Sequence, residues 1–257
     1  MPVTTPFGGW VPVRATALVC MLEASSHTCF RQQVLGGVMC WSATADLVAG
    51  SGIAAVGVVC VVRLRRARDL PLGALPLLLG THQIVESAVW RSGGGTGPAT
   101  LAWAVIALPL LAVWVPFGVW LAAPPAARSR LVAPAAVGIA TSGVLAYFLG
   151  TRPVTAQIRG HTLGYVLDLP HAPLIVGGYL LATVGSLLLG GDPLLRLLGV
   201  LVAAGAVICA ALWRLEFIST WCAFAAVAAV VMLAWVRRRP DGPVPPRLSG
   251  ARSPAGR

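Results

Sequence analysis

Two side chains with obvious chemical potential, His82 and Glu86, lie inside an otherwise apolar stretch from Leu70 to Trp90. At a spacing of four residues they share one face of a helix and can touch. Ionisable groups within such a stretch are costly and usually face a protein interior or a water-filled cavity. Two interpretations stay open: a buried pair that fixes helix packing, or a carboxylate with a histidine neighbour that handles protons or binds a metal ion.

Two further histidines, His161 and His171, lie in the long connecting segment 151–172. Together with His82 and Glu86 they form a candidate set of ligands for zinc or a similar divalent metal ion. Glu86, His161 and His171 are also the candidate catalytic residues. The segment begins with alternating apolar residues, so a short hairpin or an interfacial helix could lie over Glu86 as a lid. A solvated loop with ordinary histidines is the alternative.

Cysteine offers another possible constellation, because Cys40 and Cys222 are expected on the same side of a membrane. A disulfide between them would suit an oxidising exterior. The alternatives are two small buried apolar residues, or a catalytic thiol near a histidine. The chain has no C-x-x-C motif, so a thioredoxin-like redox site is not indicated.

The elements that position these residues are apolar segments long enough to cross a bilayer. The chain is 57% hydrophobic and 11% charged, a composition typical of membrane proteins. We predict an all-α bundle of seven transmembrane helices. Five of them cover residues 43–62, 70–90, 100–122, 131–150 and 173–189. The apolar run 194–236 is too long for one span and is divided at Arg214–Glu216 into a sixth and a seventh.

Three regions of the chain are expected. Residues 1–38 lack the long apolar segments of the rest of the chain. A ribosome-binding site followed by a start codon would encode Gly36-Gly37-Val38-Met39 if that DNA were translated in the same reading frame. We therefore expect translation to begin at Met39. Residues 39–236 form the membrane domain, and the proline- and arginine-rich residues 237–257 form a disordered basic cytoplasmic tail.

The distribution of arginine predicts the orientation of the bundle. Seven spans place four arginines on one side, Arg91, Arg152, Arg159 and Arg214. Ten lie on the other side: Arg63, Arg65, Arg66, Arg68, Arg128, Arg130, Arg196, Arg237, Arg238 and Arg239. The arginine-rich side is expected in the cytoplasm, which leaves the N-terminus outside and the C-terminus inside.

Asp46 falls in the first turn of the first predicted helix, which Ser42 or Thr44 can cap. A carboxylate at this position complements the helix dipole, and we assign Asp46 that role ahead of a catalytic one.

Nineteen arginines and no lysine account for the net charge of +11. Arginine codons are GC-rich and lysine codons are AT-rich, so this usage indicates a GC-rich coding sequence. The absence of lysine excludes a retinal Schiff base. Because no basic segment is interleaved with aromatic residues outside the apolar spans, we expect no nucleic-acid partner. Membrane lipid is the expected partner, and the plasma membrane the expected location of this multi-pass protein.

Several motifs together resemble an uncharacterised bacterial membrane-protein family whose members open with Met-Cys-(Trp/Phe)-Ser-Ala. The resemblance covers about residues 39–235. It departs from the family pattern at His82, where members often carry Gln, and at Ala223, where they tend to carry Phe. The matching motifs are Met39-Cys40-Trp41-Ser42-Ala43, the set Gln83, Glu86 and Trp90, the pairs Gly160-His161 and Pro170-His171, and Ser219-Thr220-Trp221-Cys222.

The resemblance implies a polytopic membrane protein that starts at Met39, and it implies no activity. We therefore predict an integral membrane protein of undetermined biochemical activity, with an outward-facing polar site around Glu86 and segment 151–172. The alternatives are a membrane-embedded, metal-dependent hydrolase of lipid or envelope substrates, and a proton-coupled carrier of a small molecule.

Overall fold

A computed structural model describes residues 42–159, 162–211 and 217–238. The chain divides into the units Met1–Cys40 and Trp41–Arg257, and everything described here belongs to the second. Residues 1–38, the tail from Arg239 onward and the predicted break Arg214–Glu216 lie outside the described residues. So does Cys40, while Cys222 lies in a helix whose side chains are not described at that position, so the predicted disulfide stays a prediction.

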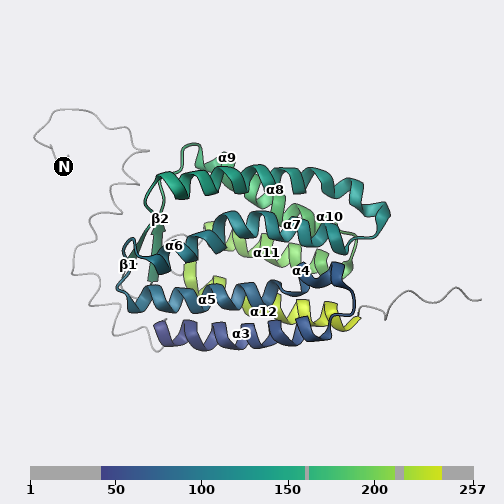
Figure 1. The fold of residues 1–257 in the computed structure, drawn as a ribbon, viewed down its shortest axis with the longest axis horizontal. Helices are drawn as coiled ribbons and strands as arrows, with labels where there is room; N and C mark the ends of the chain where they lie inside the picture. Colours follow the sequence, from purple (N-terminus) through teal and green to yellow (C-terminus); the bar gives the residue numbers. More distant parts are fainter. Residues whose placement is uncertain (1–41, 160–161, 212–216, 239–257) are drawn as a thin grey trace, which may run out of the picture. The chain divides into compact units, whose positions relative to one another are not determined.

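The described residues form a helical bundle, in agreement with the predicted all-α class, with one β-hairpin at one end (Figure 1). All seven predicted apolar segments are helical. The helices are α3 (Ala43–Arg63), α4 (Leu70–Gly73), α5 (Leu75–Arg91), α6 (Pro98–Val105), α7 (Leu111–Ala122), α8 (Pro125–Thr151), α9 (Ala172–Leu180), α10 (Ser186–Leu189), α11 (Pro193–Ala211) and α12 (Phe217–Arg238). The 3₁₀ turn η1 (Ala67–Asp69) precedes α4, and the π-helical turns η2 (Ile106–Leu110) and η3 (Leu181–Gly185) join α6 to α7 and α9 to α10.

Four helical stretches are long and apolar enough to cross a membrane: Ala43–Arg63, Pro98–Ala122, Pro125–Thr151 and Ala172–Leu189. Pro193–Val207 is a shorter apolar helix. Many of their large apolar side chains face outward, among them Ile139, which is 64% exposed, and Leu174, which is 77% exposed. A surface of this kind fits a multi-pass membrane protein in contact with lipid.

Prolines and polar caps determine several helix boundaries. The Ser42 hydroxyl accepts from the Ala45 N–H (3.4 Å), as the sequence predicts, and Asp192 caps α11 by accepting from the Leu194 N–H (2.9 Å). Helix α8 begins at Pro125, earlier than the predicted Leu131, because a proline suits the first helical turn. Arg128 therefore lies inside the helix, and its guanidinium stacks on the Trp120 ring at 5.4 Å.

Helices α3 and α5 pack antiparallel, with glycines at the contact. A Cβ atom added to Gly80 would lie 2.4 Å from the Ala54 nitrogen, and one added to Gly57 would lie 2.3 Å from the Leu77 nitrogen. Small residues allow two helix backbones to approach this closely. The buried positions of α3 recur at spacings of four and three, and they are Asp46, Gly50, Ile53, Gly57 and Cys60. Asp46 is therefore part of the packed stripe that faces α5.

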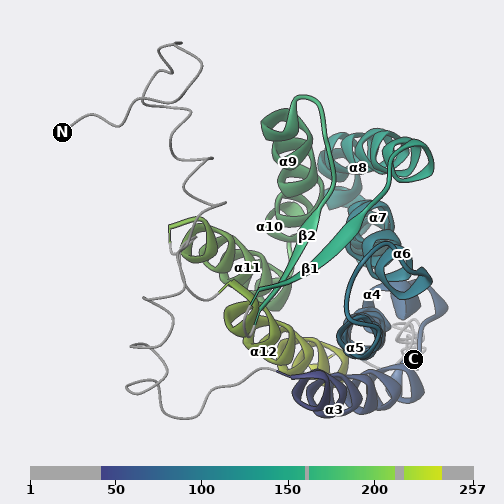
Figure 2. The same cartoon turned by 90° about the vertical axis from the view of Figure 1, so that its left-hand side faces the viewer.

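The hairpin closes one end of the bundle. Strands β1 (Thr155–Arg159) and β2 (Thr162–Val166) pair antiparallel, with Thr155 opposite Val166. Figure 2 shows the hairpin lying across the ends of the surrounding helices. We call this end the hairpin end. At the opposite end lie the C-terminus of α3 and the starts of α8 and α11, and we call it the arginine end because most of the predicted cytoplasmic arginines lie there.

Candidate functional site

Buried and partly buried polar side chains at the hairpin end form the candidate site, which we call the Glu86 site. Its members are Asp46 on α3, His82, Gln83 and Glu86 on α5, Trp103 on α6 and Tyr165 on β2. Glu86 is 4% exposed and Asp46 is 0% exposed, although both lie near the ends of their helices. Carboxyl groups are buried so completely only when protein groups replace their hydration.

Asp46 reaches Glu86 because α3 and α5 are in close contact. A Cβ atom added to Gly50 would lie 2.8 Å from the Gln83 Cβ, which fixes the two helices in register one turn below Asp46. The Asp46 carboxylate lies near enough to interact electrostatically with both Glu86 and Tyr165. The dipole role assigned to Asp46 from the sequence is therefore incomplete, because its side chain also faces the Glu86 site.

The hairpin supplies a hydrogen-bond donor to Glu86. The Tyr165 hydroxyl donates to Glu86 Oε1 at 3.5 Å, which is a long hydrogen bond. The Tyr165 ring stacks on the indole of Trp103, with ring centroids 3.4 Å apart and an interplanar angle of 5°. Burial, followed by the neighbouring carboxylates of Glu86 and Asp46, raises the pKa of Tyr165 above its usual range. Tyr165 therefore stays a neutral donor at any physiological pH.

His82 faces the same layer but does not pair with Glu86 through Nε2. This nitrogen is buried without a hydrogen-bond partner, and the imidazole packs against Trp103 with ring centroids 4.9 Å apart. The indole Nε1 of Trp103 lies near Glu86 but also makes no hydrogen bond of ordinary geometry. The site thus retains unused donors and acceptors, which native interiors seldom leave without a reason.

The hairpin is anchored over the site at three places. Gly95 and Ala156 exchange two backbone hydrogen bonds, of 2.8 and 3.0 Å, which joins β1 to the α5–α6 loop. Gly94 in this loop has a φ of +77°, and a side chain there would meet the Ala156 carbonyl oxygen at 2.7 Å. At the base of the hairpin, Arg152 forms an ion pair of 2.6 Å with Asp168.

An apolar cluster is the third anchor and excludes water from the site. Val89 on α5 and Leu163 on the hairpin are both buried, and Trp90 packs against them. The segment for which a hairpin or an interfacial helix was predicted is therefore a β-hairpin with apolar contacts of its own.

The other predicted site residues are placed differently. His171 is exposed at the start of α9 with a φ of +54°, and His161 lies outside the described residues. Within the described part of the chain, no three His, Cys, Asp or Glu side chains gather in a way that could hold a metal ion. The predicted metal set of His82, Glu86, His161 and His171 stays a prediction, of which the structure brings together His82 and Glu86.

Residues 39–246 match the model of a family of unknown function, DUF6629. The chain belongs to that family. This confirms the resemblance drawn from the sequence to an uncharacterised membrane-protein family, over nearly the same residues. Neither the curated proteins nor the solved structures gave a match.

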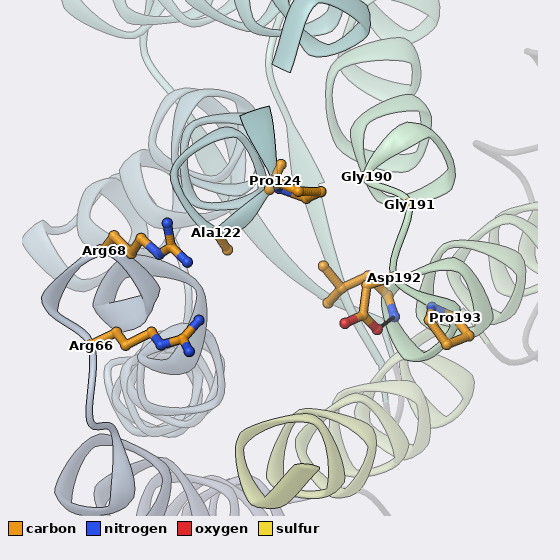
Figure 3. A pocket seen from close by; sticks show the side chains of 10 residues that line it. Arg66, Arg68, Ala122, Pro124, Gly190, Gly191, Asp192 and Pro193 are labelled. Carbon is orange, nitrogen blue, oxygen red and sulfur yellow. Dashed lines mark hydrogen bonds between the residues drawn. The ribbon is translucent and has the colours of Figure 1, made fainter. Parts of the chain in front are cut away.

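A second polar feature lies at the arginine end, where side chains line a cavity of about 330 Å³ that we call the arginine pocket (Figure 3). Its lining residues are Arg66, Arg68, Ala122, Ala123, Pro124, Gly190, Gly191, Asp192, Pro193 and Leu195. The sequence shows the arginines but not the cavity, because the lining comes from three corners of the bundle that are distant in the chain.

Proposed function

We propose that this member of DUF6629 is a multi-pass protein of the plasma membrane of a GC-rich bacterium, in which the Glu86 site is an outward-facing proton-binding site. The hairpin end is then outside and the arginine end is cytoplasmic, as the count of ten arginines against four favours. The observation that carries the proposal is the burial of two carboxyl side chains, Asp46 and Glu86, in one layer beneath the hairpin.

Charge and burial together favour a bound proton at this site. Two neighbouring carboxylates in an apolar interior cannot both ionise at low cost, so the pair holds one proton between its members. A group that changes protonation within a membrane span is the usual element of proton-coupled transport or signalling.

The hairpin would control access to this proton. Tyr165 contacts Glu86 directly, so displacement of β2 would remove a hydrogen bond and admit water together. We propose that a small molecule entering from the outer side is exchanged in this way, coupled to protonation of the pair. Glu86 is the titrating residue, Asp46 is the residue that shares its proton, and Tyr165 is the lid residue.

The experiment compares Glu86→Gln with Glu86→Leu in a strain from which the gene is deleted. Gln retains shape and hydrogen bonding but removes the titrating group, whereas Leu also removes the partner of Tyr165. We expect Glu86→Gln to fold within about 1 kcal/mol of the wild type and to fail to restore the deletion phenotype. Full rescue by Glu86→Gln, with loss of stability only in Glu86→Leu, would show that Glu86 serves packing alone. The control is Asp241→Asn, which removes a carboxylate from the predicted cytoplasmic tail and should rescue fully.

A metal-dependent hydrolase is the second candidate, and the orphaned Nε2 of His82 supports it. A neutral imidazole nitrogen beside a carboxylate could supply two ligands of a zinc site, and His161 is the residue predicted from the sequence to complete it. Metal analysis of purified protein separates the two candidates. Zinc at one equivalent that is lost in both His82→Gln and His161→Gln would favour the hydrolase, and metal-free protein with a titrating Glu86 would favour the proton site.

A further inference from the structure

The arginine pocket has the size and position of a ligand site. It lies where the turn after α3, the α7–α8 corner and the α10–α11 corner meet, at the end of the bundle opposite the Glu86 site. Its volume of about 330 Å³ falls within the range of small-molecule pockets. Gly191, with a φ of +82°, turns the chain tightly at the rim, where a larger residue would be strained.

Two guanidinium groups, those of Arg66 and Arg68, face this cavity. In Figure 3 the side chains of Arg66 and Arg68 extend side by side from one wall toward the space opposite Asp192. Within the described part of the chain, neither arginine makes a hydrogen bond or an ion pair. Paired guanidinium groups match the oxygens of a phosphate in geometry as well as in charge.

Asp192 occupies the far wall and limits the charge of the pocket. Its Oδ1 accepts from the Leu194 N–H at 2.9 Å, and its Oδ2 accepts from the Trp235 indole at 3.1 Å. Because both oxygens have partners, Asp192 is held away from the arginines as a structural cap. Two arginines and one carboxylate give the lining a net charge of +1, which matches the single negative charge of a phosphodiester.

Apolar surface beside the pocket indicates where such a phosphodiester comes from. Leu188 and Leu189, directly before the Gly190 corner, are 37% and 39% exposed, and Leu197 on α11 is 46% exposed. Acyl chains can lie along these side chains while the head group enters the pocket. Basic pockets between helices on the cytoplasmic side of a membrane are suited to lipid head groups.

We infer that the arginine pocket binds the phosphodiester head group of a membrane phospholipid, with Arg66 and Arg68 as its phosphate ligands. This inference concerns the end opposite the Glu86 site and does not depend on the proton-binding function. The lipid would hold the three corners together at the membrane surface.

The test is phospholipid binding to the full chain in detergent, measured by native mass spectrometry and by thermal stabilisation. The probes are phosphatidylethanolamine, phosphatidylglycerol, glycerophosphoethanolamine and inorganic phosphate. We expect one phospholipid per chain to be retained by the wild type, and binding at least about tenfold weaker in Arg66→Gln/Arg68→Gln, because two charge-assisted hydrogen bonds are lost. The control is Arg63→Gln/Arg130→Gln, which removes two exposed arginines outside the pocket and should bind as the wild type does.

Two results would overturn the inference. One is equal loss of lipid in the two double variants, which would mean that general positive charge attracts it. The other is saturation by inorganic phosphate or glycerophosphoethanolamine at the concentration at which the lipid binds, which would mean a free phosphate site. If the Gln double variant does not fold, Arg66→Lys/Arg68→Lys retains the charge but not the planar donor geometry, and weakened binding is still expected.

Discussion

The two ends of the bundle place their charged side chains differently: acidic groups are buried at one end, and basic groups face a cavity at the other. At the hairpin end, Asp46 and Glu86 are sealed beneath a hairpin that brings its own apolar contacts. At the arginine end, Arg66 and Arg68 face an open cavity and have no partner among the residues that the structure describes. A sealed carboxyl pair is suited to a proton, which needs no room, whereas an open basic pocket is suited to a larger anion. One bundle therefore carries two sites of different chemistry, separated by the apolar core between them.

The largest expected effect is an all-or-none difference in thiol labelling. It tests which side of the membrane each end of the bundle faces. We expect Thr96→Cys, in the exposed α5–α6 loop, to be labelled by an impermeant thiol reagent on intact cells. Ser129→Cys, exposed at the arginine end, should be labelled only after permeabilisation. Both are made in a background without the native cysteines. The reverse pattern would place the Glu86 site in the cytoplasm and contradict the arginine count.

The next prediction tests the contact between α3 and α5 that brings Asp46 and Glu86 together. Gly80→Ala should destabilise the protein by about 1–3 kcal/mol, because its Cβ would overlap the α3 backbone. Gly52→Ala on α3 is the control, since a Cβ there meets nothing within 4 Å and the better helix former should be neutral or slightly stabilising. Thermal unfolding in detergent measures both. Equal tolerance of the two substitutions would mean that α3 and α5 are not in such close contact.

These glycines also show what the sequence could and could not predict. The apolar segments are long and uninterrupted, so the seven helical segments follow from length and composition, as does the cap at Ser42. The partner of Asp46 does not, because it depends on which helices pack together. The spacing from Asp46 through Gly50, Ile53 and Gly57 is the available signal, and it predicts a buried stripe without naming the opposite helix.

The hairpin shows the same limit. Alternating apolar residues at its start leave a short hairpin or an interfacial helix as alternatives, and the structure has β1 there. The docking of Ala156 on Gly95 and of Tyr165 on Trp103 joins residues far apart in the chain, which no local pattern specifies. The predicted metal set depends on the expectation that its four residues lie on one side of the membrane. The structure places one of them, His171, at the exposed start of α9.

A smaller and local effect is expected when the hairpin loses its aromatic contact. Tyr165→Ala should remove the stacking on Trp103 and lower the local opening free energy of residues 155–166 by about 2 kcal/mol. Hydrogen exchange of β1 and β2 measures this change, and exchange at the arginine end should not alter. Tyr147→Ala, at an exposed tyrosine on α8, is the control and should leave the hairpin protected. Unchanged protection in Tyr165→Ala would show that the hairpin is held mainly by its backbone contacts.

The most direct test of the proton site is infrared spectroscopy of the purified protein as the pH is varied. Wild type should show the carbonyl band of a protonated, buried carboxylic acid at neutral pH, and the band should shift in heavy water. Glu86→Gln should lose this band and Asp46→Asn should change its titration, while Asp241→Asn in the predicted tail should change neither. A neutral-pH spectrum without a protonated carboxyl band in the wild type, or the same band in Glu86→Gln, would contradict the account.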